Sequence, residues 1–302
     1  MSAPAVHIAT FYRFVSLPEY EALREPLLAQ CQALAITGTV LLAAEGINAT
    51  LAGGREALHS LLVWLGESAS LANLTPRWST APDSPFRKMK VKLRQEIVTL
   101  GVPGIEPDRR TGRHVPPAEW NALIRDPQTL VVDTRNLYET GIGSFAGATD
   151  PGTRNFREFP DYVAQQLDPT EHKRVAMFCT GGIRCEKASA LLLHAGFEEV
   201  CQLKGGILAY LDEVAKAESL WWGECFVFDE RVAVDSALAP GSYAQCYACR
   251  RPVSDEDRQH PHYEAGISCP ACYDDLTPAQ RASFAERKRQ RELAAARVQS
   301  TS

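Results

Sequence analysis

The chain has 302 residues, of which 45% are hydrophobic, and this is enough for two domains and a small appendage. No apolar run approaches the roughly 20 residues of a membrane-spanning helix, and the first residues lack the pattern of a signal peptide. We therefore expect a cytoplasmic protein. The net charge of −5 argues against nucleic-acid binding through bulk charge, so any RNA contact must use local basic patches.

The first part of the chain, residues 5–98, predicts an independent α+β domain. Strand-like and helix-like segments follow in the order βαββαβ, which is the ferredoxin-like, or acylphosphatase-like, pattern. Strands are expected at residues 6–14, 36–44, 48–51, 76–78 and 88–100, and helices at residues 18–32 and 55–65. The tetrapeptide Ala44-Glu45-Gly46-Ile47 predicts a tight hairpin between the second and third strands.

The last strand of this domain is strongly basic, because residues 86–94 carry five positive charges and no negative charge. With a period of two, the basic side chains share one face of the strand and the apolar ones lie opposite. The basic residues on that face are Lys88, Lys90, Lys92 and Arg94. Such a ribbon suits the phosphate backbone of RNA, and it suits equally well an edge strand whose lysines prevent pairing with other sheets. The sequence leaves both interpretations open.

An α/β domain is expected at residues 121–222, after a linker at residues 99–120 that is rich in glycine, proline and arginine. Strand-like and helix-like segments alternate here, which is typical of a parallel sheet covered by helices. Strands are expected at residues 130–135, 174–178 and 199–203, and a helix at residues 188–194. Open sheets of this kind place their sites at the carboxyl ends of the strands.

A reactive cysteine is predicted at such a strand end, in residues 178–187. Cys179 lies between the end of a strand and the start of a helix, where backbone N–H groups and the positive end of the helix dipole lower the pKa of a thiol. Gly181 and Gly182 let the backbone curl around the sulfur, and Arg184 adds a positive charge. The alternative is a buried cysteine that packs as a small hydrophobe, which the pattern of the loop disfavours.

The spacing in this loop distinguishes two classes of enzyme. Four residues separate Cys179 from Arg184. Cysteine-dependent phosphatases use a longer loop, wide enough for a phosphate, whereas this tighter one resembles the active-site loop of rhodaneses, which suits a persulfide sulfur. Residues 138–148 and 204–207 resemble the corresponding segments of a rhodanese domain.

The C-terminal part, residues 223–280, predicts a small zinc-binding region. Two CxxC pairs are separated by nineteen residues, a spacing in the usual range for structural zinc. The four cysteines are Cys246, Cys249, Cys269 and Cys272. A shell of four thiolates leaves no open position for a substrate, so the expected role of the metal is structural. The alternative is that these are unconnected reduced thiols, and His260 and His262 between the pairs are possible substitute ligands.

Residues 281–302 predict a basic helix or tail, as part of a helix that starts at Thr277 with Pro278 in its first turn. Its run of basic residues at 287–291 suits contact with RNA, but such a run is more often only the polar face of a helix or a fraying tail.

Taken together, these parts resemble the rhodanese-like tRNA uridine hydroxylase family. The resemblance covers about residues 5–275 and is carried by residues 44–50, 84–91, 178–190, 204–207 and 222–229. It implies an enzyme that hydroxylates the wobble uridine of certain tRNAs at C5 to give 5-hydroxyuridine, with molecular oxygen as co-substrate and tRNA as partner. The residues alone indicate a persulfide-forming sulfurtransferase. A non-catalytic binding module is a third alternative, against which the intact Cys179 and Arg184 count.

No conventional redox centre for such a reaction is evident in the sequence. Hydroxylation by dioxygen normally uses a flavin, iron or another redox centre. The sequence contains no dinucleotide-binding fingerprint and no evident set of two histidines and a carboxylate for iron. We therefore expect Cys179 to react itself, either as a thiolate that adds to C6 of uracil or as a persulfide. Cys185 is expected either to resolve an oxidised Cys179 or to be a helix residue without chemistry.

Overall fold

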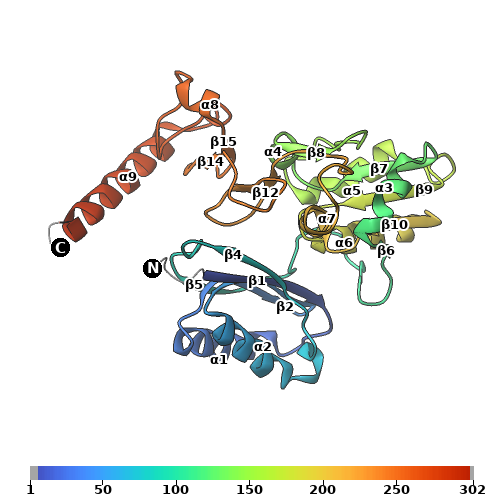
Figure 1. Ribbon diagram of the computed structural model, residues 1–302, viewed down its shortest axis with the longest axis horizontal. Helices are drawn as coiled ribbons and strands as arrows, with labels where there is room; N and C mark the ends of the chain where they lie inside the picture. The colour runs from blue at the N-terminus through green and yellow to red at the C-terminus, as the bar shows by residue number, and fades with distance from the viewer. Residues whose placement is uncertain (1–5, 300–302) are drawn as a thin grey trace. The chain divides into compact units, whose positions relative to one another are not determined.

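The computed structural model describes residues 6–299, so residue 5 and residues 300–302 of the predicted parts lie outside the described residues. The chain divides into two compact units (Figure 1). The first comprises residues up to Leu137 together with Phe145–Leu220, and the second comprises Tyr138–Ser144 together with the chain from Trp221 onward. Within residues 6–299, no helix is both long enough and apolar enough to cross a membrane.

The first unit begins with the predicted acylphosphatase-like domain. Its elements are β1 (Val6–Phe14), α1 (Tyr20–Ala33), β2 (Thr37–Ala43), β3 (Gly46–Gly53), α2 (Arg55–Gly66), a short 3-10 turn (Ala69–Leu71), β4 (Arg77–Ala81) and β5 (Met89–Leu93). The strand order in the sheet is β4-β1-β3-β2-β5, so β5 is an edge strand, and it runs parallel to β2. The two helices cover one face of this sheet (Figure 1).

The alternation of side chains in β1 explains this packing. Ala9 and Phe11 belong to the core under the helices, whereas Thr10 and Tyr12 alternate with them and point to the opposite face, which we call the helix-free face. The predicted hairpin is confirmed, with its turn at Ala44 and Glu45. Gly46 adopts a φ of +139°, and a Cβ there would collide with the carbonyl group of Arg13, so only glycine fits.

One predicted strand is shorter than expected. The segment at residues 88–100 forms a strand only as far as Leu93. Beyond it, the N–H of Ile97 donates to Glu45 Oε1 at 2.7 Å, and the N–H of Leu100 donates to Glu96 Oε2 at 3.0 Å. Carboxylates therefore satisfy backbone groups that a strand would pair with a neighbouring strand.

The second part of this unit has the predicted parallel sheet. Its elements are β6 (Arg113–Val115), α3 (Pro117–Arg125), β7 (Thr129–Asp133), α4 (Leu137–Thr140), β8 (Gly143–Phe145), a 3-10 turn (Phe156–Glu158), α5 (Phe159–Gln166), β9 (Arg174–Phe178), α6 (Ile183–His194), β10 (Glu199–Leu203) and α7 (Gly206–Glu213), of which α4 and β8 reach into the second unit. The strand order is β6-β10-β9-β7, with every pair parallel. β6 and the start of α3 fall within residues 99–120, the segment expected to be a linker.

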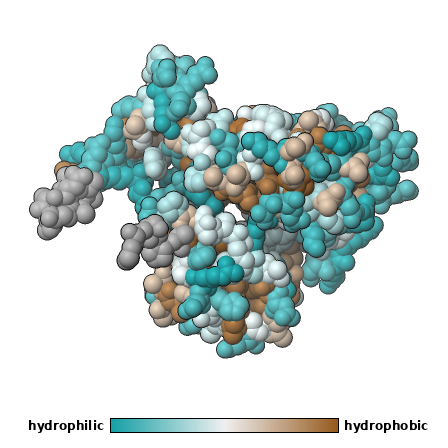
Figure 2. Space-filling view, viewed as in Figure 1, coloured by the Kyte–Doolittle hydropathy of each residue, from teal (hydrophilic) through white to brown (hydrophobic). Residues whose placement is uncertain are grey.

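The second unit is built of short strands and one long helix. Its elements are β11 (Trp221–Gly223), β12 (Cys225–Phe226), β13 (Ala233–Val234), β14 (Ala244–Gln245), β15 (Pro252–Val253), α8 (Asp255–Gln259) and α9 (Pro278–Gln299). The predicted cap of α9 is present, because the Thr277 hydroxyl accepts the N–H of Gln280 at 3.2 Å. Most of the coloured surface of this helix in Figure 2 is hydrophilic, as expected for a solvated helix, although Leu293 is exposed.

Candidate active site and metal cluster

The Cys179 loop connects β9 to α6 and wraps around the sulfur atom. Cys179 is 1% exposed, and the N–H of Gly182 donates to its Sγ at 3.1 Å. The backbone N–H groups of Arg184 and Cys185 also donate to this sulfur. Gly182 has a φ of +98°, a conformation that side chains other than hydrogen rarely adopt. The predicted arrangement of a glycine turn, a helix start and a sulfur inside them is present.

This arrangement favours the thiolate. Burial works against ionisation of Cys179, but the hydrogen bond from the Cys185 thiol, the charge of Arg184 and the two backbone N–H groups outweigh it and lower the pKa of Cys179 to about 6. Burial raises the pKa of Cys185, and the adjacent Cys179 raises it further. Cys179 is therefore the anion of the pair, and Cys185 is the neutral donor.

Arg184 and Cys185, in the first turn of α6, are both buried. The Arg184 guanidinium donates to the Thr180 hydroxyl at 3.4 Å, so it lies within the loop. Cys185 Sγ lies 3.5 Å from Thr134 Oγ1 at the end of β7. Both residues thus contact the reactive loop from inside the domain.

The turn before α7 supports the loop from the other side. The N–H groups of Ile207 and Leu208 donate to the carbonyl oxygens of Cys179 and Thr180, at 2.9 and 3.1 Å. Gly206 has a φ of +67°, and a Cβ on it would come within 2.5 Å of the Cys179 carbonyl oxygen. This contact explains why the segment 204–207 needs glycine beside the loop.

A buried carboxylate, Glu186, occupies the first turn of α6. It accepts hydrogen bonds from Tyr12, His114, Thr111 and Gln202. Sequence reasoning missed this group, because its members come from four distant segments and only their fold brings them together. The one local signal was a carboxylate in the first turn of the helix that follows the reactive cysteine.

The next residue, Lys187, joins the two domains of the first unit. Its side chain is 2% exposed, and its Nζ lies 2.7 Å from Glu45 and 2.5 Å from Glu96. Glu45 belongs to the hairpin turn of the N-terminal domain, and Glu96 follows β5. The carboxylate in the segment 44–50 is thus explained by a contact with α6, the helix that follows the Cys179 loop.

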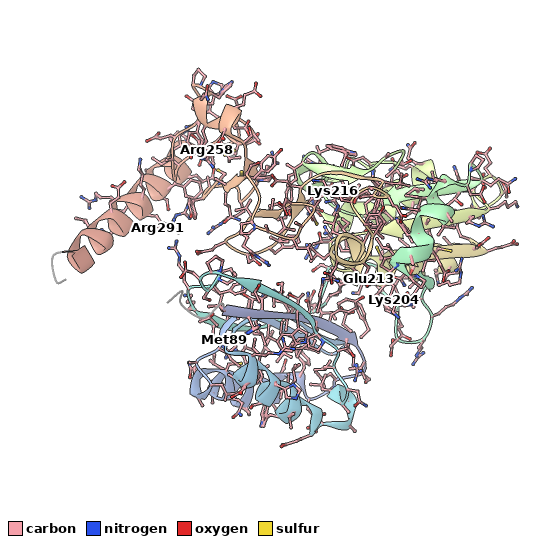
Figure 3. All side chains as sticks on the ribbon, viewed as in Figure 1. Met89, Lys204, Glu213, Lys216, Arg258 and Arg291 are labelled. Atoms are coloured by element: carbon pink, nitrogen blue, oxygen red, sulfur yellow. The ribbon has the colours of Figure 1, made fainter. Side chains whose placement is uncertain are left out.

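The basic residues at the end of the N-terminal domain lie on the edge strand β5, which contains Lys90 and Lys92, or directly beside it, as Lys88 and Arg94 do. Val91 is buried, and Met89, labelled in Figure 3, packs against the core with it. Lys88, Lys90 and Arg94 are exposed and Lys92 is half-buried. Burial and the charges of Lys90 and Arg94 lower the pKa of Lys92. Among residues 6–299, none of these four cations has a carboxylate within ion-pair distance.

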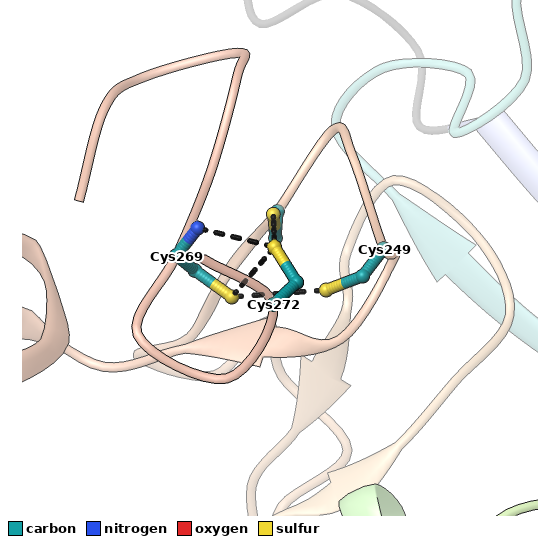
Figure 4. A group of neighbouring side chains, drawn as sticks. Cys249, Cys269 and Cys272 are labelled. Atoms are coloured by element: carbon teal, nitrogen blue, oxygen red, sulfur yellow. Dashed lines mark hydrogen bonds between the residues drawn. The ribbon is translucent and has the colours of Figure 1, made fainter. Parts of the chain in front are cut away.

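The four predicted cysteine ligands converge in the second unit (Figure 4). Their sulfur atoms lie within 4.8 Å of one another, with Cys246 to Cys272 at 3.9 Å and Cys249 to Cys269 at 3.7 Å. A tetrahedral ion with metal–sulfur bonds of about 2.3 Å separates its sulfur ligands by about 3.8 Å. The cluster can therefore hold a metal ion. His262 stacks instead on Tyr273, with ring centres 3.9 Å apart, and neither His260 nor His262 belongs to the cluster.

Comparison with known proteins agrees with this architecture. Residues 6–97 match the UPF0176 acylphosphatase-like domain, and residues 116–213 match the rhodanese-like domain. A protein of Teredinibacter turnerae named tRNA uridine(34) hydroxylase is 56% identical over 287 residues, which are 95% of this chain and 89% of that protein. The chain belongs to the tRNA uridine(34) hydroxylase family. The family resemblance expected from the sequence is thereby confirmed.

Two solved structures are similar to parts of the chain. A rhodanese-like domain from an Anabaena species matches 37% of this chain and 80% of its own, with 20% identity and a TM-score of 0.31. An acylphosphatase from Coxiella burnetii matches 29% of this chain and 90% of its own, with 17% identity and a TM-score of 0.21.

Proposed function

We propose that this protein hydroxylates the wobble uridine of tRNA, at position 34, to give 5-hydroxyuridine in the cytoplasm. The observation that carries the proposal is the 56% identity, over 95% of the chain, to a protein named tRNA uridine(34) hydroxylase. The enclosed loop around Cys179 supports it, because it supplies a nucleophile of lowered pKa at the carboxyl end of β9.

In this proposal Cys179 is the nucleophile. Its thiolate adds to C6 of the uracil ring. This addition makes C5 electron-rich, so that C5 attacks dioxygen as a nucleophile. One oxygen atom replaces the hydrogen on C5, and the other leaves as water. The two electrons come from two thiols, which are oxidised to a disulfide, and Cys179 leaves C6 as the ring double bond forms again. Arg184 and the loop N–H groups stabilise the leaving thiolate.

The substrate path that we propose crosses the helix-free face of the N-terminal sheet. Strand register places one row of side chains across all five strands. The row consists of Arg77, Thr10, Thr50, Thr39 and Lys90. The row itself contains no carboxylate, but Arg77 at its end is paired with Asp212 of α7, at 3.2 Å. The hydroxyl groups of the three threonines suit the sugars and phosphates of a single strand of RNA.

A second row on the same face leads to the reactive loop. It consists of Lys92, Leu41, Asn48 and Tyr12. This second row therefore begins on the basic edge strand β5 and ends at Tyr12, which contacts the Cys179 loop. A wobble base is already unpaired, so bringing it to Cys179 costs only local unstacking, on the order of a few kcal/mol.

For the four-cysteine cluster we propose zinc with a structural role. Four thiolates are a ligand set typical of structural zinc, and binding energy from the ion helps to fold a segment whose own core is small. Cys246, Cys249, Cys269 and Cys272 would hold the ion, and a closed shell leaves it no part in the reaction.

A rhodanese-type sulfurtransferase is the second candidate, favoured by a loop whose short spacing suits a persulfide. Nucleoside analysis by mass spectrometry of tRNA from a strain that lacks the gene separates the two functions. Loss of 5-hydroxyuridine and of the oxyacetic-acid-type nucleosides made from it supports hydroxylation. Loss of a thiolated nucleoside, with the oxygenated ones intact, would refute hydroxylation and support sulfur transfer.

A further inference from the structure

Glu186 lies directly behind the reactive loop, and its carboxylate is 10% exposed. Each of its oxygens accepts two hydrogen bonds. Oε1 accepts from the Tyr12 hydroxyl at 3.1 Å and from His114 Nε2 at 2.8 Å. Oε2 accepts from the Thr111 hydroxyl at 2.8 Å and from Gln202 Nε2 at 3.0 Å. A carboxylate held by so many donors is fixed in place and stays ionised.

Tyr12 is the donor that comes from the N-terminal domain. Its hydroxyl packs against Gly182, because a Cβ on that glycine would come within 2.8 Å of the oxygen. Burial, the charge of Glu186 and the charge of Cys179 all raise the pKa of Tyr12. The hydroxyl therefore keeps its proton, and it lies near both anions, the carboxylate and the thiolate.

His114 connects the same carboxylate oxygen to solvent, since its side chain is 43% exposed. The hydrogen bond to Glu186 raises the pKa of His114, against the effects of burial and of Lys204. Burial opposes ionisation of Glu186, but the hydrogen bond and the charge of His114 outweigh it and lower the pKa of Glu186. The 2.8 Å contact thus favours the imidazolium form of His114 and the carboxylate form of Glu186, while Arg184 and the Cys185 thiol face Cys179 from α6.

We propose that Tyr12, Glu186 and His114 act as one positioning unit for the reactive loop. Glu186 holds the tyrosine of the N-terminal domain against Gly182, and His114 cancels the charge of the carboxylate close to Cys179. The unit thereby fixes the position of the proposed tRNA path on the N-terminal domain relative to the Cys179 thiol. The effect on hydroxylation rests on the proposed function, whereas the effect on the thiol is independent of it.

Two variants with opposite effects on charge test this unit. Glu186→Gln removes an anion near Cys179, and His114→Gln leaves that anion uncompensated. In the full-length protein, the pH midpoint for alkylation of Cys179 by iodoacetamide, followed by peptide mass spectrometry, should fall by about one unit in Glu186→Gln and rise by about one unit in His114→Gln. If the substitutions merely loosened the loop, the Cys179 sulfur would lose N–H donors in both variants. The pH midpoint for alkylation would then rise in both. Shifts of the same sign, or none, would overturn the proposal.

Glu171→Gln and His172→Gln are the matched controls, because they remove the same side-chain types from the segment between α5 and β9. They should leave the midpoint unchanged, and equal shifts in them would contradict the proposal.

Tyr12→Phe tests the tyrosine, since it removes only the hydroxyl group. Loss of a hydrogen bond to a charged group should lower kcat for 5-hydroxyuridine formation by about tenfold. KM for tRNA should change little, because the ring remains. An unchanged kcat would overturn the role of Tyr12. If the wild-type protein forms no 5-hydroxyuridine at all, the proposed function fails, and the alkylation midpoints still decide the charge effect.

Discussion

At the scale of single residues, the charge of Cys179 results from opposing effects. Complete burial alone would keep the thiol neutral, as it does for Cys31, whose pKa burial raises to about 12. Cys179 differs because its loop directs backbone N–H groups, the Cys185 thiol and the Arg184 charge at one sulfur. The same kind of side chain thus favours the neutral thiol in the core of one domain and the thiolate at the strand end of the other.

A lowered pKa means that the thiolate is present above that pKa and is lost as the pH falls through it. Alkylation of Cys179 in the wild-type protein should therefore be half-maximal at a pH of about 6. Cys185→Ala removes a donor to the thiolate and should move this midpoint upward. A wild-type midpoint near the ordinary thiol value of 9.0 would contradict the account of the loop.

At the scale of elements, the sequence predicted those elements whose residues are contiguous in the chain. The strand–loop–helix around Cys179 was predictable because strand, glycine turn and helix start are contiguous in sequence. The end of β5 at Leu93 was not, because the N–H of Ile97 finds its acceptor in Glu45, far away in the chain. β6 has three residues and too little pattern to be distinguished from a linker.

The basic edge strand allows a charge-reversal test. Replacing both Lys90 and Lys92 by Glu should weaken tRNA binding by about tenfold or more and flatten its salt dependence, because phosphate contacts release counterions. Filter binding at several salt concentrations measures both quantities. The double variant Lys173→Glu and Lys216→Glu changes the net charge equally at exposed sites and should bind nearly as wild type. Unchanged affinity and salt slope in the first variant would make β5 only a guard against aggregation.

The cysteine cluster makes a separate prediction about metal content. The purified protein should contain about one zinc ion per chain, and Cys246→Ser should lower both zinc content and solubility, because the ion helps to fold the segment. Elemental analysis by mass spectrometry measures the zinc. Cys225→Ser, in the same unit but outside the cluster, should keep the metal. A stable wild-type protein without metal would rule out structural zinc.

At the scale of the whole molecule, the order of the parts could be predicted from sequence, and the residues that join them could not. The motifs around Cys179 and the cysteine pairs are short, and each can be recognised from a few contiguous residues. The sequence around Lys187 and Tyr12 gives no sign of their role. Only the fold places Lys187 beside Glu45 and Tyr12 beside Glu186. These contacts attach the N-terminal domain to the first turns of the helix that follows the reactive cysteine.

The central claim is that this molecule hydroxylates uridine 34 of tRNA through Cys179. The most direct measurement is mass spectrometry of tRNA nucleosides from a gene-deletion strain that expresses either the wild-type protein or Cys179→Ala. Wild type should restore 5-hydroxyuridine and its derivatives, and Cys179→Ala, present at equal level and folded by circular dichroism, should restore none. Full restoration by Cys179→Ala would contradict the account.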